Sequence, residues 1–293
     1  MEKLVEAIKE NRPNLSESSV KTYKNVITCL YRTLRGTAEM DHKFFTTHVK
    51  DVMAHLQTVK YNVRKTILSA LVALTTGDVH HTYRTQMMED AHKYNALQKE
   101  NLMTGVQRAN WIPWSEVEET LEKLKKKVDY IWKEKSPSRA EMMNLQKYVL
   151  LACYVLIPPR RAMDFCKMKF RHFDKEKDNY YEKGTFYFRQ YKTAKFTGLE
   201  TKKVPKSLEA LIKKWFAFRK DEDLMFSDFM GSELSSSQVT KILNGIFGKA
   251  ISINQLRHIY ITEKEAPIFQ QLEDTAKDMG HSVAQARLYV KKE

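Results

Sequence analysis

The chain has 293 residues, of which 42% are hydrophobic, with only nine glycines, seven prolines and three cysteines, and its formal net charge is +14. This length predicts about two domains, and the scarcity of glycine and proline favours a mainly helical protein over a strand-rich one. No apolar run approaches the ~18–20 residues of a membrane span, the first residues are not a signal peptide, and scattered cysteines argue against a disulfide framework or a zinc site.

A reducing, intracellular location follows from this cysteine usage, and secretion is not expected. The positive charge indicates a polyanionic partner, because neutralising phosphates releases counterions and supplies affinity that is independent of sequence. The alternative is a basic protein with no role in binding nucleic acid.

Residues 1–103 are predicted to form a helical domain. Apolar residues recur at helical spacing over 20–34, 44–56, 63–74 and 81–103, the first of these between serine caps and Gly36. Basic groups at helix starts or off the apolar stripes are candidates to contact a DNA backbone, and the alternative for each is a solvent-facing helix surface. These candidates are Lys21, Lys24, Lys60, Arg64 and Lys65. Further along the chain, Arg160 and Lys195 are also candidates to contact DNA.

A short polar stretch, 104–110, is the predicted linker to a second domain over 111–293. Capping boxes, Ser115 with Glu118 and Ser138 with Glu141, are expected to start its first two helices. The second of these helices is strongly apolar and must end at the two prolines 158–159, since proline lacks the amide that a helix needs.

Arg160 and Arg161 come directly after those prolines. An arginine placed between two helices has its backbone fixed on both sides, and the new helix N-terminus favours an anion. The alternative is a solvent-facing pair of loop arginines.

The only clear strands are 185–191 and 201–205, joined by a hairpin tip that carries Lys192 and Lys195. Helices are predicted over 208–218, 237–247, 253–263 and 267–279. The predicted fold class is therefore mainly α with a small β-sheet, an α+β fold.

In chain order, the second domain offers Arg161, Lys192, Arg257, His281 and Tyr289. Arginine presents a planar fork of donors that fits two phosphate oxygens, and histidine donates a hydrogen bond or shuttles a proton. Tyrosine becomes a covalent nucleophile once its hydroxyl is aimed and its proton is taken. Each residue alone is common for structural reasons, but the set in this order suggests chemistry on a phosphodiester.

This set resembles the tyrosine recombinase superfamily of the phage-integrase type. Over residues 110–293 the resemblance lies in motifs, and over residues 1–103 it lies only in the expectation of a helical domain. Arg161 followed three positions later by Asp164 matches the first arginine box. The hairpin lysine is matched best by Lys192, with Lys195 second. The wording Pro-Pro-Arg-Arg and Met-Gly-His-Ser is also similar to integrases of large DNA viruses and related mobile elements.

The two remaining boxes of the family lie near the end of the chain. The second box, usually His-x-x-Arg-His, reads Asn254-Gln255-Leu256-Arg257-His258, and the third is matched by Gly280-His281-Ser282 with Tyr289. Asn254 is a departure, because an amide donates to a phosphate oxygen but does not act as acid or base near neutral pH. Asn254 is still expected to be one of the catalytic residues; if the histidine usual at this position accepts the tyrosine proton, that task passes to His281, His258 or water.

The resemblance implies a site-specific recombinase or integrase that cuts and rejoins double-stranded DNA through a 3′-phosphotyrosyl intermediate, with no metal, nucleotide or other cofactor. Tyr289 would be the nucleophile, and Arg161 with Arg257 would hold the two non-bridging oxygens. Lys192 would protonate the leaving 5′-oxygen, and His281 would add a hydrogen bond. Asp164 would support the site, and the two domains would close around DNA as a C-shaped clamp.

Three other functions stay open. A type IB topoisomerase uses the same kinds of residue to relax supercoils, a catalytically impaired DNA-binding regulator of recombination is compatible with Asn254, and a helical RNA-binding protein would be basic as well. Four residues follow Tyr289, too few for a docked helix of several turns. We therefore expect a monomer without DNA and a tetrameric synapse on DNA, held by helix 267–279, by the N-terminal domains or by a tail beyond this sequence.

Overall fold

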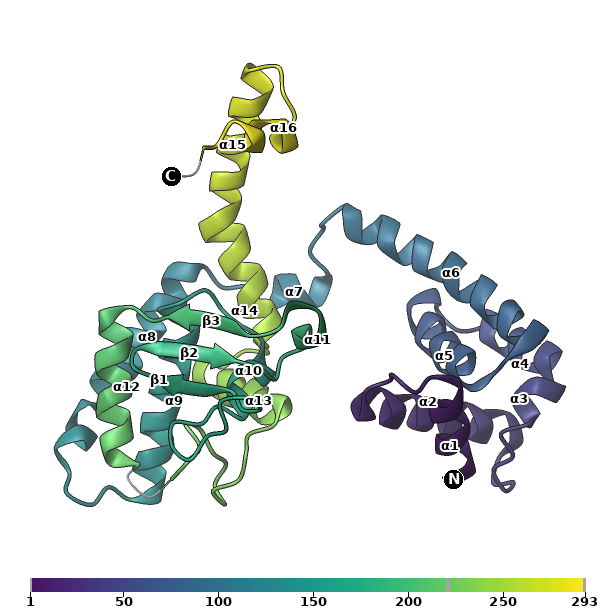
Figure 1. The fold of residues 1–293 in the computed structure, drawn as a ribbon, viewed down its shortest axis with the longest axis horizontal. Helices are drawn as coiled ribbons and strands as arrows, with labels where there is room; N and C mark the ends of the chain where they lie inside the picture. The colour runs from purple at the N-terminus through teal and green to yellow at the C-terminus, as the bar shows by residue number, and fades with distance from the viewer. Residues whose placement is uncertain (1, 220–221, 292–293) are drawn as a thin grey trace. The chain divides into compact units, whose positions relative to one another are not determined.

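The computed structural model describes residues 2–219 and 222–291. The chain forms two compact units, Met1–Leu102 and Met103–Glu293, and each is described by itself. Most elements are helices, and one three-stranded antiparallel sheet lies in the second unit (Figure 1). The predicted mainly helical α+β fold class is confirmed at this level. Across the described residues, helices that combine the length and the apolarity needed to cross a bilayer are absent.

The first unit consists of helices packed around one apolar core. Leu4, Ile27, Phe45 and Leu68 are among its fully buried side chains. Ser16 caps the predicted first helix and Gly36 ends it with a positive φ of 64°. The helices are α1 (Glu2–Asn11), α2 (Glu17–Arg35), α3 (Phe44–Thr47), α4 (Val49–Gln57), α5 (Tyr61–Leu74) and α6 (Gly77–Lys99).

The predicted single helix over 44–56 is wrong, because His48 interrupts it. The backbone of His48 has φ −116° and ψ 40°, which ends α3 and starts α4. Its ring stacks on Phe44 with 4.6 Å between the ring centroids, and Nδ1 lies 2.8 Å from the hydroxyl of Thr47. These local contacts hold the His48 side chain at the point where the helix is interrupted.

The second unit is built around Phe165. Its ring makes edge contacts with Tyr154, Phe186 and Phe188, which join the long buried helix α9 to the sheet. The elements before and within the sheet are α7 (Gly105–Ala109), α8 (Trp114–Val128), η1 (Asp129–Lys133), α9 (Arg139–Val155), α10 (Ala162–Cys166), β1 (Tyr180–Glu182), β2 (Thr185–Phe188), α11 (Ala194–Thr197) and β3 (Glu200–Lys203). Those that follow are α12 (Lys206–Phe218), α13 (Ser236–Phe247), α14 (Ile253–Tyr260), η2 (Ile261–Glu265), α15 (Ala266–Asp278) and α16 (Val283–Leu288).

The sheet has the order β1-β2-β3 with antiparallel pairing, and Phe186 of β2 lies opposite Lys202 of β3. The two predicted strands are present, although both are shorter than predicted. Strand β1 was not anticipated. The predicted hairpin tip contains a helical turn, α11.

One of the two predicted capping boxes is correct. Ser138 caps α9 and its box with Glu141 is complete. The box at Ser115 is wrong, because Pro113 is the N-cap of α8 and the helix already begins at Trp114. The carboxylate of Glu118 instead accepts a hydrogen bond from the indole of Trp114 at 2.9 Å.

The stretch 104–110 forms helix α7, with its own capping box between Thr104 and Gln107. Two contacts attach it to the second unit. The side chain of Gln255 donates to the carbonyl of Gln107 at 3.1 Å, and the amide of Ala250 donates to Asn110 at 2.9 Å.

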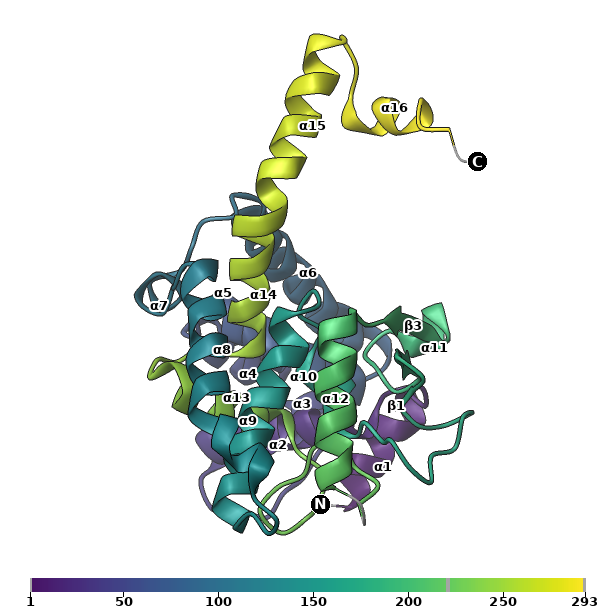
Figure 2. The same cartoon turned by 90° about the vertical axis from the view of Figure 1, so that its left-hand side faces the viewer.

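The two predicted helices over 253–279 form one continuous helical run. Helix α14 passes through the π-helical turn η2 into α15, which extends away from the sheet (Figure 2). The short helix α16 follows and was not anticipated. Of the predicted tail after Tyr289, Lys292 and Glu293 lie outside the described residues.

Candidate phosphate-binding site

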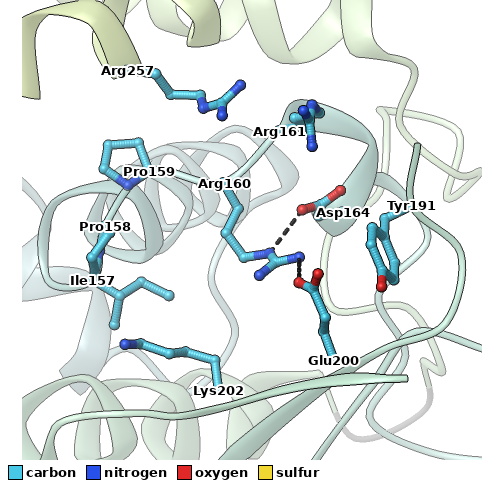
Figure 3. A pocket seen from close by; sticks show the side chains of 10 residues that line it. All are labelled: Ile157, Pro158, Pro159, Arg160, Arg161, Asp164, Tyr191, Glu200, Lys202 and Arg257. Atoms are coloured by element: carbon cyan, nitrogen blue, oxygen red, sulfur yellow. Dashed lines mark hydrogen bonds and ion pairs between the residues drawn. The ribbon is translucent and has the colours of Figure 1, made fainter. Parts of the chain in front are cut away.

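Arg161 and Arg257, predicted to act together, line the same pocket of about 280 Å³ in the second unit (Figure 3). The pocket lies where the loop after α9, the start of α10, the sheet and α14 meet. The residues that line it are Ile157, Pro158, Pro159, Arg160, Arg161, Asp164, Tyr191, Glu200, Lys202 and Arg257.

Arg161 is held by the backbone on both sides. It is the N-cap residue of α10, with φ −68° and ψ 152°, and it follows the predicted proline stop. Its carbonyl oxygen accepts a hydrogen bond from the amide of Asp164 at 3.0 Å. Within residues 2–219 and 222–291, its guanidinium group has neither a hydrogen bond nor an ion pair. Arg161 therefore lines the pocket without a direct ion-pair partner, although the Asp164 carboxylate in the same lining attracts its charge through space.

Arg257 reaches the pocket from α14. The buried side chains of Leu256 and Ile259 fix this helix in the core, and Ser252 caps it. Burial lowers the pKa of Arg257, and the like charge of Arg161 lowers it further. Arginine stays protonated at neutral pH all the same. In the described part of the chain its guanidinium also lacks a hydrogen-bonding or ion-pairing carboxylate, so two repelling cations face the same space.

Arg160 has a different environment from its neighbour. Its guanidinium donates to Asp164 at 2.7 Å and to Glu200 at 2.8 Å (Figure 3). The guanidinium also lies 3.9 Å from the ring centroid of Phe188. Sequence analysis predicts a DNA contact for Arg160. In the structure, its charge is balanced by two carboxylates.

Asp164 connects these arginines. Its side chain is 2% exposed, and burial raises its pKa while Arg160 opposes that rise. One oxygen accepts from Arg160, whereas Oδ1 is buried without a hydrogen-bond partner among the residues described. This buried carboxylate holds Arg160 in the lining of the pocket.

The lysine that lines the pocket is Lys202, which the sequence analysis did not select. It lies on β3, and the strand register that turns it toward the pocket was not visible in the sequence. Lys192 and Lys195 are exposed on the tip between β2 and β3. Lys192 directly follows Tyr191, which does line the pocket, so it starts at the pocket rim.

His281 and Tyr289 form a second, separate group. Their rings stack with 5.2 Å between centroids and an interplanar angle of 23°. His281 follows Gly280, whose φ of 72° ends the run of α15, and Tyr289 is the C-cap residue of α16. Neither residue lines the arginine pocket. Asn254 is exposed on α14, one turn before Arg257, and is likewise absent from the lining.

Arg64, a predicted DNA contact, is buried and paired in the structure. Arg64 is 7% exposed and donates to both oxygens of Asp90, at 2.7 and 2.6 Å, and to Gln57 at 2.9 Å. The hydrogen bonds to Asp90 raise its pKa. Its neighbour Lys65 lies over the ring of Tyr94, 3.9 Å from the centroid. Arg64 holds α5 to α6 and has no free face for a phosphate.

The remaining N-terminal candidates lie at the surface or near it. Lys60 is exposed and precedes α5, while Lys21 and Lys24 lie on α2. Lys24 lines a hollow of about 600 Å³ together with Arg32, which sequence analysis overlooked although it lies on the same helix face at helical spacing. The other residues of the hollow are Asn25, Thr28, Cys29 and Thr33.

Comparison with known proteins adds no further assignment. The chain matches no family model, no curated protein and no solved structure. Its functional assignment therefore depends on the chemistry of the arginine pocket and of the predicted motif residues.

Proposed function

We propose that this chain is a site-specific DNA recombinase or integrase of the tyrosine recombinase type, acting on double-stranded DNA inside the cell. One observation carries the proposal. Arg161 and Arg257 point into one pocket without carboxylate partners among the described residues, and their charges repel. A phosphodiester relieves this repulsion, because its two non-bridging oxygens accept hydrogen bonds from two guanidinium groups.

Strand cleavage would proceed by attack of the Tyr289 hydroxyl on the phosphorus. The new bond is a 3′-phosphotyrosyl ester, the bond to the 5′-oxygen breaks, and Lys192 supplies the proton that makes a 5′-hydroxyl. His281 is a candidate to take the tyrosine proton, since its ring stacks against that of Tyr289. Attack by a 5′-hydroxyl of a second duplex reverses these steps and joins the strands.

Negative charge grows on the non-bridging oxygens in the five-coordinate transition state. Arg161 and Arg257 are cations already in place, and a donor of this kind contributes a factor of about 10²–10³ to the rate. We also propose a role for each of the two units. The first unit binds DNA through the basic face of α2 around Lys24 and Arg32, and the second unit performs the chemistry.

Tyr289 must reach the arginine pocket for this chemistry. The proposal therefore includes a rearrangement of α15 and α16 on DNA, within a synapse of four subunits. The separation of Tyr289 from the pocket favours a second candidate, a DNA-binding regulator of recombination that does not cleave. A type IB topoisomerase remains the third, and it would yield relaxed plasmid instead of joined partners.

A library of nicked duplexes with randomised sequence tests the proposal. Cleavage near a nick releases a short strand and traps the covalent adduct, which survives denaturing electrophoresis and disappears on protease treatment. We expect an adduct with the wild-type protein and with Tyr260→Phe, and none with Tyr289→Phe.

Tyr260 is a suitable control because it is the next candidate for the nucleophile if Tyr289 does not attack. Its ring packs edge-on against Trp114 at 5.0 Å, and burial raises its pKa. Binding of duplexes without any adduct would favour the regulator. An adduct formed by Tyr289→Phe and lost in Tyr260→Phe would move the nucleophile to Tyr260.

A further inference from the structure

Phe196 is the most exposed aromatic ring among the large apolar side chains that the structure describes, at 81%. It lies on the tip between β2 and β3, residues 192–199, with Leu199 41% exposed on the same tip. A single exposed apolar residue is common on a protein surface, but neighbouring ones can mark a binding site, and a ring of this size gains free energy when a partner covers it.

The tip is ordered by its own hydrogen bonds. The hydroxyl of Tyr191 donates to the carbonyl of Gly198 at 2.7 Å, and the amide of Gly198 donates to Ala194 at 2.8 Å. Gly198 has a φ of 74°, a conformation that glycine adopts without strain. Phe196 therefore projects from a closed turn, so that little conformational entropy is lost when it contacts a partner.

The charge of the tip favours a polyanion. Lys192 and Lys195 are its two ionisable residues, with no acidic residue from 192 to 199. The ammonium of Lys195 lies 5.1 Å from the centroid of the Phe196 ring. Glu200, just beyond the tip, is already paired with Arg160. An apolar ring flanked by lysines fits a nucleic acid better than it fits the apolar surface of a protein.

The tip also begins and ends at the arginine pocket, since Tyr191 and Glu200 both line it. Consecutive Cα atoms are 3.8 Å apart, so the four steps from Glu200 place Phe196 within about 15 Å of the pocket rim. Base pairs of a duplex rise by about 3.4 Å, so this reach corresponds to about four base steps from a phosphate in the pocket.

We propose that Phe196 is an apolar wedge that inserts between bases and unstacks one base step close to the phosphate held by Arg161 and Arg257. Lys195 contacts a flanking phosphate. This inference rests on the proposed function. Wedges of this kind act best at pyrimidine–purine steps, which are easily kinked, so the wedge also gives sequence preference at a position without hydrogen bonds to bases.

The experiment uses duplexes recovered by filter binding from the randomised library, which requires binding but no cleavage. A 2-aminopurine is placed in turn at each position within about four base steps of the cleaved or protected phosphate. Unstacking raises its fluorescence. We expect a rise at one step with wild type and with Phe196→Trp, none with Phe196→Ala, and an affinity about tenfold lower for Phe196→Ala.

Phe229→Ala is the matched control, because Phe229 is 58% exposed on another loop of the same unit, beneath Arg139. It is expected to behave as wild type. Binding or adduct formation without any fluorescence rise overturns the wedge and leaves the proposed function intact. Equal effects of Phe229→Ala and Phe196→Ala also overturn it. Failure to recover any bound duplex overturns the wedge and the proposed function together.

Discussion

Arg160 and Arg161 follow one another in the chain, yet only Arg160 is paired with carboxylates. Arg160 donates to Asp164 and Glu200, whereas Arg161 faces the pocket beside Arg257. The N-cap geometry at Arg161 produces this difference, because the chain turns into α10 at that residue. Arg160 therefore holds the lining of the pocket together, whereas Arg161 contributes positive charge to the pocket.

Arg161→Ala and Arg257→Ala are each expected to slow cleavage by about 10²–10³, the effect of losing one donor to a transition-state oxygen. Their thermal stability without DNA is expected to stay close to that of wild type, since each substitution removes the repulsion between the two arginines together with an attraction to Asp164. Single-turnover adduct formation and thermal unfolding measure the two effects. Arg139→Ala is the control for loss of a surface arginine. A severe loss of cleavage in Arg160→Ala with a mild one in Arg161→Ala would shift the motif by one residue.

Arg160→Ala is expected to destabilise the fold by about 1–3 kcal/mol near neutral pH, because it leaves the buried Asp164 without its cation. Burial already raises the pKa of Asp164 in the fold, and loss of Arg160 raises it further. The folded variant then retains a proton that the unfolded chain releases. The destabilisation is complete above the raised folded pKa and shrinks as the pH falls through it.

Urea unfolding near neutral pH and at about pH 5 measures this dependence. The double variant Arg160→Ala/Asp164→Asn lacks the titrating carboxyl and is the control. Its stability relative to wild type is expected to change less between the two pH values. An Arg160→Ala deficit that is the same in acid and at neutral pH would show that the ion pair is not the cause.

A chemical rescue experiment can identify which of three lysines, Lys192, Lys195 or Lys202, is the general acid. A sulfur in place of the bridging 5′-oxygen leaves as a thiolate and needs no proton, so it rescues loss of the general acid alone. We expect Lys192→Ala to be rescued in single-turnover cleavage, and Lys195→Ala and Lys202→Ala to show no rescue. Rescue of Lys202→Ala would assign the acid to β3, where that residue lines the pocket.

Arg64→Ala is expected to lower the free energy of unfolding by about 3–5 kcal/mol, the cost of leaving the buried Asp90 unpaired. Lys65→Ala is the neighbouring control, since it removes a contact with Tyr94 worth about 1 kcal/mol or less. Urea unfolding measures both.

By contrast, Lys24→Ala is expected to reduce the slope of log affinity for DNA against log salt concentration by about one, without loss of stability. A stable Arg64→Ala protein with weakened DNA binding would restore the surface role predicted for Arg64.

Local signals in the sequence predicted most helices and two of the three strands. Ser138 and Glu141 lie three residues apart and satisfy each other, so their helix start could be predicted from the chain alone. Ser115 and Glu118 have the same spacing but fail, because Glu263, far along the chain, accepts the amide of Trp114 at 2.6 Å. Only the tertiary structure reveals such a partner.

Prediction of the candidate site from the sequence was also limited by contacts that only the tertiary structure reveals. Arg161 could be selected because the prolines before it and the helix after it fix its backbone locally. Arg64 could not be recognised as buried, since its partner Asp90 comes from the next helix and its basic side chain is typical of a surface residue. Lys202 was missed because a one-residue difference in strand register decides which face of a strand a side chain occupies.

The carboxylate of Glu263 has a mechanical consequence. It lies in the π-helical turn and accepts from the indole of Trp111 at 3.0 Å as well as from the amide of Trp114, while Lys264 pairs with Glu118 at 3.1 Å. The turn is thus anchored to the start of α8, and any swing of α15 must pivot on its far side. In such a swing Arg257, on α14 before the turn, would keep its place, while Tyr289, which follows α15, would move. Under the proposed function, Arg161 and Arg257 would bind the phosphate before Tyr289 reaches it, so DNA capture and strand cleavage would be two separately timed events.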